Sequence, residues 1–144
     1  MGAAVLLSDP SGRVLLVEPT YKDYWEIPGG CVDVDESPHT AVGRELKEEL
    51  GLVVPLGRLL VTDWVKPREG RTEGMMFVFD GGVLASEQAE QIHLPPDELR
   101  RWAWCTDQEA AAGLSELLAR RIAAAMRARA EGTCVYLESG CFVV

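Results

Sequence analysis

Apolar residues along most of the chain form short aliphatic runs that turn-forming residues separate. The first two runs lie within residues 3–19 and flank the turn sequence DPSG at residues 9–12, which predicts a β-hairpin. A short strand is predicted at residues 24–27, where Pro28 and the glycine pair after it end the apolar stretch. The remaining predicted strands are residues 58–65, 75–84, 99–105 and one within 133–144.

Two stretches change to helical spacing. Apolar residues recur every fourth position from Val42 to Leu50, and Gly51 follows at the place of a helix C-cap, so a helix is predicted from residue 37 or 39 to residue 50. The alanine-rich residues 114–130 predict a closing helix. Strands interleaved with two main helices indicate an α+β (α/β) fold, a mixed β-sheet sandwiched between α-helices. Because 144 residues is a usual domain size, residues 1–144 are predicted to form a single domain.

Charge and cysteine content limit the classes of partner. The net charge of -9 argues against binding of a nucleic acid polymer, because a polyanion needs a basic surface. A small phosphorylated ligand stays compatible if a divalent cation bridges it to the protein. The four cysteines have no C-x-x-C spacing, so free buried thiols are expected rather than a zinc site. With no signal-peptide pattern and no apolar run of membrane-spanning length, we expect a cytoplasmic protein without a membrane partner.

Three glutamates of the first predicted helix raise the question of chemistry. Glu45, Glu48 and Glu49 share an arc of roughly 100° beside the apolar stripe, because helical residues advance by about 100° each. Glu45 and Glu49 form a like-charge pair that costs about a few tenths of a kcal/mol in an isolated helix. A bound Mg²⁺ would reverse this repulsion, since it prefers carboxylate, water and phosphate oxygens. On the helix pattern alone, an acidic face that serves only solubility is the simpler alternative.

The residues around this helix favour the metal site. Residues 30–52 fit the pattern G-x5-E-x7-R-E-U-x-E-E-x-G-U, where U is a bulky aliphatic residue, at every specified position. The matching residues are Gly30, Glu36, Arg44, Glu45, Leu46, Glu48, Glu49, Gly51 and Leu52. This stretch resembles the Nudix box, and the chain is similar to Nudix hydrolases. The resemblance extends more loosely over most of the chain, through WEIPGG before the box and DELRRWAW after it.

The resemblance implies a metal-dependent enzyme with the Nudix fold. Nudix hydrolases hold Mg²⁺ or Mn²⁺ in a loop, helix and second loop, and water attacks a pyrophosphate phosphorus of a nucleoside diphosphate derivative. By matching position, the implied metal ligands are the Gly29 carbonyl, Glu45, Glu48 and Glu49, with Glu45 and Glu49 the most dependable.

Other matching residues would support the ligands. Gly30 would permit a tight turn in the loop predicted for residues 29–38. Arg44 would act through Glu36 by holding the loop against the helix, since the helical wheel turns Arg44 away from the carboxylate centre. The general base is a box glutamate in some Nudix enzymes and a later glutamate in others. Glu98 is the candidate outside the box, and the alternatives in the same acidic stretch are Glu87 and Glu90.

The substrate stays open among several alternatives. Pro67 lies 15 residues beyond Leu52, which resembles the ADP-ribose pyrophosphatase branch and suggests ADP-ribose or another ADP-sugar. The compact length favours a MutT-like nucleoside triphosphate pyrophosphohydrolase. A third alternative, from another class, is a non-catalytic nucleotide-binding regulatory domain, although such domains usually lose a box carboxylate. A homodimer and a monomer both remain open. Candidate substrate contacts in loops are Lys66, Arg68 and Arg71 for phosphates, and Tyr21, Tyr24 and Trp25 for a base.

Overall fold

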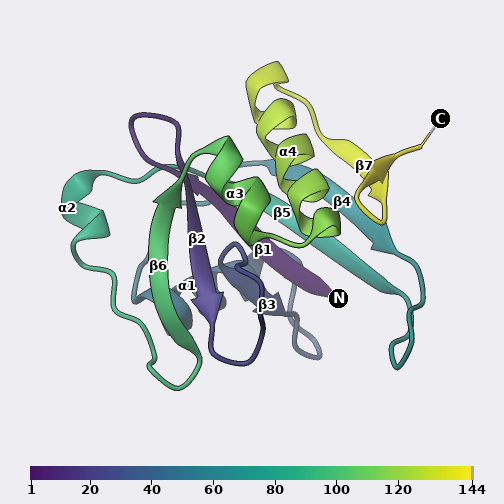
Figure 1. The fold of residues 1–144 in the computed structure, drawn as a ribbon, viewed down its shortest axis with the longest axis horizontal. Helices are drawn as coiled ribbons and strands as arrows, with labels where there is room; N and C mark the ends of the chain where they lie inside the picture. The colour runs from purple at the N-terminus through teal and green to yellow at the C-terminus, as the bar shows by residue number, and fades with distance from the viewer. Residues whose placement is uncertain (144) are drawn as a thin grey trace.

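The computed structural model describes residues 1–143 and arranges eight strands in one mixed sheet with helices on both faces (Figure 1). Along the sheet the strands run in the order β6-β2-β1-β5-β4-β7-β8, and β3 pairs with β1 outside this path. The strands are β1 (Gly2–Ser8), β2 (Val14–Pro19), β3 (Gly29–Cys31), β4 (Leu59–Val65), β5 (Gly74–Val83), β6 (Leu99–Cys105), β7 (Val135–Glu138) and β8 (Cys141–Phe142). The helices are α1 (Pro38–Leu50), α2 (Ser86–Ala89), α3 (Asp107–Gly113) and α4 (Glu116–Glu131).

β1 is an inner strand of the sheet and is buried along its whole length. On one edge it pairs in parallel with β5, and on the other it pairs antiparallel with two different strands. β2 contacts it where Ser8 faces Val14, whereas β3 contacts its first residues, Gly2 to Ala4. The sheet therefore divides beside β1, and β3 lies next to the N-terminal half of that strand.

Each face of the sheet has its own apolar core. On one face α1 packs Val42 and Leu46 against Val5 of β1, in a cluster of buried aliphatic residues. On the other face α3 and α4 cover the sheet, and Ile122 packs in a cluster with Leu6. Figure 1 shows α3 and α4 in front of the sheet and α1 behind it. The predicted mixed sheet between helices is confirmed.

Local signals at both ends fix the extent of α1. Ser37 is the N-cap, and its side chain accepts a hydrogen bond from the backbone N–H of Thr40. Pro38 occupies the first turn, where its missing N–H costs nothing. Gly51 ends the helix in the left-handed conformation, with φ of 69°. Caps of this kind stabilise a helix by about 1 kcal/mol each. The predicted helix is confirmed, and it ends at the expected residue.

The glycine pair does not end a strand, and this part of the prediction is wrong. Residues 24–27 form only an isolated bridge between Glu26 and Val17, while Gly29–Cys31 is the strand itself. Consequently residues 29–38 are not entirely loop, because β3 takes the first three of them. Gly29 suits this strand because the strand lies very close to β1, so that a Cβ on Gly29 would overlap the backbone of β1.

The C-terminal half holds more elements than the sequence predicts. The short helices α2 and α3 are additional, and the predicted last strand is two strands, β7 and β8, joined by a turn. Val144, at the end of that prediction, lies outside the described residues. The cysteines are free, but Cys31, Cys134 and Cys141 are exposed rather than buried as expected. In residues 1–143, no helix combines the length and apolar character needed to cross a membrane.

Candidate functional site

The contact between α1 and β3 holds one carboxylate away from solvent. Glu49 accepts a hydrogen bond from the backbone N–H of Gly29, at 2.8 Å. Burial is the main cause that raises the pKa of Glu49 to about 8, and the negative charges of Glu45, Glu26 and Glu98 raise it further. The hydrogen bond from Gly29 opposes these effects. A carboxylate in this position is stabilised by binding a proton or a cation, because burial removes water that would solvate its charge.

Glu45 approaches the same strand one helical turn earlier. Its carboxylate lies against Gly30 so closely that a Cβ on Gly30 would collide with it. Burial also raises the pKa of Glu45, and Arg44 opposes that rise. Gly30 is therefore needed here for close approach of a side chain to the strand, a different reason from the tight turn that the sequence predicts.

Arg44 connects the loop before α1 to the carboxylates of the helix. Its Nε donates to Glu36 at 2.8 Å, and one terminal nitrogen donates to the carbonyl of Cys31 at 3.0 Å. The other terminal nitrogen donates to Glu45 at 3.1 Å and to Glu48 at 3.2 Å. The predicted contact with Glu36 is present, and the hydrogen bond lowers the pKa of Glu36 to about 2. The wheel argument that turned Arg44 away from the carboxylates is wrong, because a long flexible stem lets the guanidinium reach back to them.

Glu48 differs from the other two glutamates of the arc. Its side chain is 55% exposed, and its polar contact is with Arg44. Within residues 1–143, no three His, Cys, Asp or Glu side chains are already gathered tightly enough to hold a metal ion. The arc therefore has an inner part, Glu45 and Glu49, beside β3, and an outer part, Glu48, in solvent.

A cavity of about 720 Å³ opens beside β3. It is lined on one side by Gly29, Gly30 and Cys31, and it extends over the first residues of β1 to Arg121 on α4. The volume is in the range of sites that hold nucleotide-sized ligands. The two inner glutamates of α1 therefore lie next to the strand that forms one wall of this cavity.

The chain matches a family that fits this arrangement. The model of the NUDIX domain matches residues 1–127. The chain belongs to the Nudix hydrolase family. Enzymes of this family generally use divalent metal ions, as the motif in residues 30–52 implied.

Individual relatives agree with the family assignment. The chain is 35% identical over 95 residues to a MutT-like protein of Streptomyces ambofaciens, covering 61% of this chain and 58% of that protein. It is 31% identical over 113 residues to an RNA pyrophosphohydrolase of Halorhodospira halophila, covering 69% of this chain and 62% of that protein. The matches thus span about three fifths of these curated relatives. The crystal structure of a MutT protein from Methanosarcina mazei Go1 has the same fold, with a TM-score of 0.71 at 22% identity over 91% of this chain and 93% of that one.

Glu98 acts on the Nudix carboxylates, whereas the two alternatives to it stand on another element. Its charge raises the pKa of both Glu45 and Glu49. Glu87 and Glu90 belong to α2 and its C-cap, near the β1–β2 turn. Unlike Glu98, neither of them is among the main causes of the raised pKa of Glu45 or Glu49.

The sequence did not single out Glu26 as a site residue. Glu26 lines the cavity, raises the pKa of Glu49 and pairs with Lys22 at 2.6 Å. Little in the sequence marks Glu26 as a site residue, because it stands in an apolar segment that is predicted to be a strand. The structure instead pairs Glu26 with Val17 in an isolated bridge.

The candidate substrate contacts separate into two groups. Arg68 and Arg71 face each other across a tight turn between β4 and β5 and line the cavity, as Tyr21 does. Tyr24 is exposed, and Trp25 packs beside α3, so the cavity lining does not include them. Pro67 and Lys66 precede the turn and are exposed.

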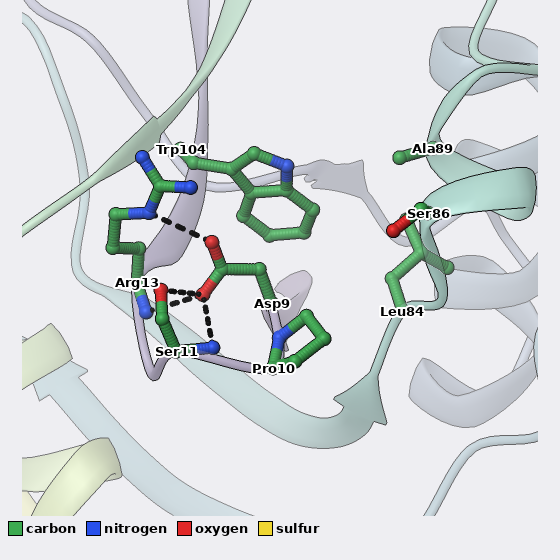
Figure 2. A pocket seen from close by; sticks show the side chains of 8 residues that line it. All are labelled: Asp9, Pro10, Ser11, Arg13, Leu84, Ser86, Ala89 and Trp104. Carbon is green, nitrogen blue, oxygen red and sulfur yellow. Dashed lines mark hydrogen bonds and ion pairs between the residues drawn. The ribbon is translucent and has the colours of Figure 1, made fainter.

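A second hollow, of about 240 Å³, lies at the other end of β1 (Figure 2). Figure 2 shows Asp9 at its centre, with Trp104 on one side and α2 opposite. The Asp9 carboxylate accepts hydrogen bonds from both Ser11 and Arg13, with Nε of Arg13 at 2.7 Å. The hairpin itself therefore satisfies this carboxylate, which fixes the β1–β2 turn rather than leaving a charge open to a ligand.

Proposed function

We propose that this Nudix protein is a divalent-metal-dependent hydrolase that cleaves the pyrophosphate linkage of a nucleoside diphosphate derivative. The observation that carries the proposal is the desolvated Glu49, bound by the N–H of Gly29 beside Glu45. An acidic helix face that served only solubility would keep its carboxylates in solvent. Glu45 and Glu49 are instead partly buried beside each other. A small acidic substrate and an acidic protein surface become compatible once a cation lies between them.

The donor set fits Mg²⁺ or Mn²⁺. Glu45 and Glu49 would be the inner ligands, the Gly29 carbonyl a further oxygen ligand, and Glu48 an outer ligand from its solvent-exposed position. All are hard oxygen donors, which these cations prefer. When bound, such a cation neutralises pyrophosphate charge and lowers the pKa of coordinated water. Arg44 is a positioning residue, because it ties Glu45 and Glu48 to Glu36.

The reaction is a hydrolysis in which one bond forms and one breaks. A water oxygen forms a new P–O bond while the bridging P–O bond of the pyrophosphate breaks, and the bridging oxygen leaves with its electron pair on the second phosphate. The water proton passes to a carboxylate. We propose Glu98 for this role, because its charge is felt by both inner glutamates and it lies outside the metal ligands.

Membership of the Nudix family leaves three candidate functions for this chain. ADP-ribose or another ADP-sugar is one candidate, which rests on Pro67 in the β4–β5 loop. A MutT-like triphosphate pyrophosphohydrolase is the second candidate, and the MutT-like relative at 35% identity favours it. A non-catalytic regulatory domain is the third, but Glu45 and Glu49 are both kept and both approach β3. For a relative named RNA pyrophosphohydrolase the substrate is RNA; the net charge of -9 favours a small nucleotide here.

The test is release of the nucleoside mono- or diphosphate product from a panel of nucleotides, with substrates and products separated by chromatography. The panel holds ADP-ribose, an ADP-sugar and the common nucleoside triphosphates, each measured with Mg²⁺, with Mn²⁺ and with excess chelator. We expect metal-dependent release from at least one of them. Nucleotide binding without any release would support the regulatory alternative and contradict the proposal. We further propose one Nudix domain over residues 1–144 and a cytoplasmic location; light scattering would distinguish a monomer from a homodimer.

A further inference from the structure

Arg121 is a buried cation in the wall of the cavity. It lies on α4, where its side chain is only 8% exposed, and its Nε donates to Asp63 of β4 at 2.7 Å. Asp63 is fully buried, and its second oxygen accepts from the backbone N–H of Gly140 at 3.0 Å. The helix, the sheet and the β7–β8 turn thus hold the guanidinium in one orientation.

Arg121 lines the cavity and has donors that its pairing with Asp63 does not use. Within residues 1–143, its side chain makes a hydrogen bond only through Nε, although a guanidinium has five donors. Nε of Arg129 is the one buried side-chain polar atom without a partner in that part of the chain, so the terminal nitrogens of Arg121 are not sealed inside the protein. Since Arg121 lines the cavity, these N–H groups are open to a ligand there.

The surroundings of the guanidinium suit a nucleobase. The cavity lining includes apolar side chains, which are Ala4, Ile27, Met76, Val78 and Leu118. A phosphate would be poorly solvated between these groups, whereas a flat aromatic ring buries its faces well there. The phosphates of the same ligand would lie toward Gly29 and Gly30, at the side of the cavity nearest the Nudix carboxylates.

We propose that Arg121 reads the base of the substrate and selects guanine over adenine. A guanidinium fork presents two parallel N–H donors, and the O6/N7 edge of guanine presents two adjacent acceptors. Adenine places an amino donor beside N7, so one donor would meet another donor in a desolvated site. The base assignment rests on the proposed hydrolase function for its substrate class, and it favours a guanine nucleotide over ADP-ribose.

The same contacts also allow a purely structural role, in which the ion pair only fastens α4 to β4. Removing one partner of a buried pair leaves an unpaired charge, so loss of stability alone would not distinguish the two roles. Base preference distinguishes the two roles, because an ion pair that only holds α4 against β4 does not depend on which base is present.

Three variants separate these effects. Arg121→Lys keeps the charge beside Asp63 but loses the planar fork. The double variant Arg121→Met with Asp63→Asn removes both charges, and the amide oxygen of the introduced asparagine can still accept from Gly140. Arg127→Met is the matched control on the same helix, since Arg127 is exposed and pairs with Glu131 one turn away. Circular dichroism melts establish that each variant is folded before it is assayed.

The measurements are kcat and KM for GTP and ATP with Mg²⁺, and calorimetric binding of GMP and AMP without metal. In the wild type we expect tighter binding of GMP than AMP and a higher kcat/KM for GTP. Arg121→Lys and the double variant should raise KM for GTP by about 10- to 100-fold and leave the ATP values nearly unchanged, because one bidentate base contact provides discrimination of this size. Arg127→Met should behave as the wild type.

The outcomes distinguish this inference from the proposed function. GMP preference that disappears in both Arg121 variants supports the inference, even if no nucleotide is hydrolysed and the proposed function fails. Hydrolysis with equal use of GTP and ATP, or with a guanine preference that survives in both variants, overturns the inference and leaves the hydrolase intact. An equal loss for every base would assign Arg121 to phosphate and also overturn it. Failure of both GMP and AMP to bind, without any base ranking in hydrolysis, overturns it as well.

Discussion

Replacement of Glu49 by Gln changes the charge at the inner carboxylate while keeping its shape. The amide oxygen of the introduced glutamine can still accept the N–H of Gly29, so β3 stays attached to α1. What disappears is a carboxylate whose pKa is raised to about 8 by burial and by neighbouring acids. The variant therefore separates the charge from the packing.

The magnitude follows from proton linkage. Between the ordinary pKa of 4.5 and about 8, the folded protein holds a proton on Glu49 that the unfolded chain has lost. The folded state then binds more protons, so the stability of the wild type falls as pH rises, by at most about 1.4 kcal/mol per pH unit. The glutamine side chain of the variant does not titrate, which removes this slope. At pH 7 the metal-free variant should be more stable by about 1–3 kcal/mol, against the few tenths that the helix pattern alone predicted.

The assay is a set of thermal melts from pH 5 to pH 8.5, with chelator and with Mg²⁺. In chelator the two proteins should melt together near pH 5 and diverge with rising pH by several degrees, at about 3 °C per kcal/mol. Addition of Mg²⁺ should stabilise the wild type more than Glu49→Gln, because linkage follows affinity for the folded state. Turnover on the best substrate should fall by at least about 100-fold, which corresponds to about 2.7 kcal/mol of transition-state stabilisation.

Parallel melting curves across this pH range would refute the argument that Glu49 is desolvated. Equal turnover of the two proteins would refute its role at the metal. The two results are independent, so each can fail alone.

Three further changes test the rest of the site. Arg44→Ala should lower the activity by about 10- to 100-fold, less than Glu49→Gln, and should lower the melting temperature, because its carboxylate partners lose their shared donor; unchanged kcat/KM would contradict its positioning role. Gly30→Ala should displace the Glu45 carboxylate and weaken Mn²⁺ binding, measured by electron paramagnetic resonance. The control Gly43→Ala, on the open face of α1, should have no effect, and equal Mn²⁺ affinity in both variants would show that the close approach of Glu45 to Gly30 is unimportant. Glu98→Gln should lower kcat by about 10²–10⁴-fold and remove the acid limb of the pH–rate profile, with Mg²⁺ stabilisation retained; a normal profile would move the general base elsewhere.

Local signals explain why the Nudix helix could be predicted so closely from the sequence. The hydroxyl of Ser37, the proline after it and the glycine at residue 51 act within a few residues of themselves, and the apolar spacing from Val42 to Leu50 needs only one neighbouring surface. Each of these signals has the same meaning whatever the rest of the chain does. The glutamate spacing is equally local, so the arc of carboxylates follows from the helical period alone.

The glycine pair shows where local reasoning stops. Gly29 and Gly30 usually indicate a turn, and nothing nearby in the sequence predicts that they form β3. The strand exists because Ala3 and Ala4 of β1 lie opposite them, more than 20 residues earlier. Pairing over such a distance depends on how the whole sheet is ordered, and that order also brings Glu26 and Glu98 toward Glu49.

The buried position of Arg121 and its need for an acidic partner could be predicted from the sequence. It stands three residues after Leu118 and four before Ala125, which places it on the apolar face of α4 rather than among the exposed arginines. A cation on a buried face requires a partner, so the helix pattern alone predicts an acidic residue somewhere in the facing sheet. Asp63 meets that requirement from the middle of the predicted strand at 58–65, where a buried acid is equally out of place. The two exceptions to the apolar pattern therefore point to each other. Within residues 1–143 the Arg121 side chain donates through Nε alone, and the same side chain lines the cavity, where on our proposal a substrate base would supply acceptors for the remaining donors.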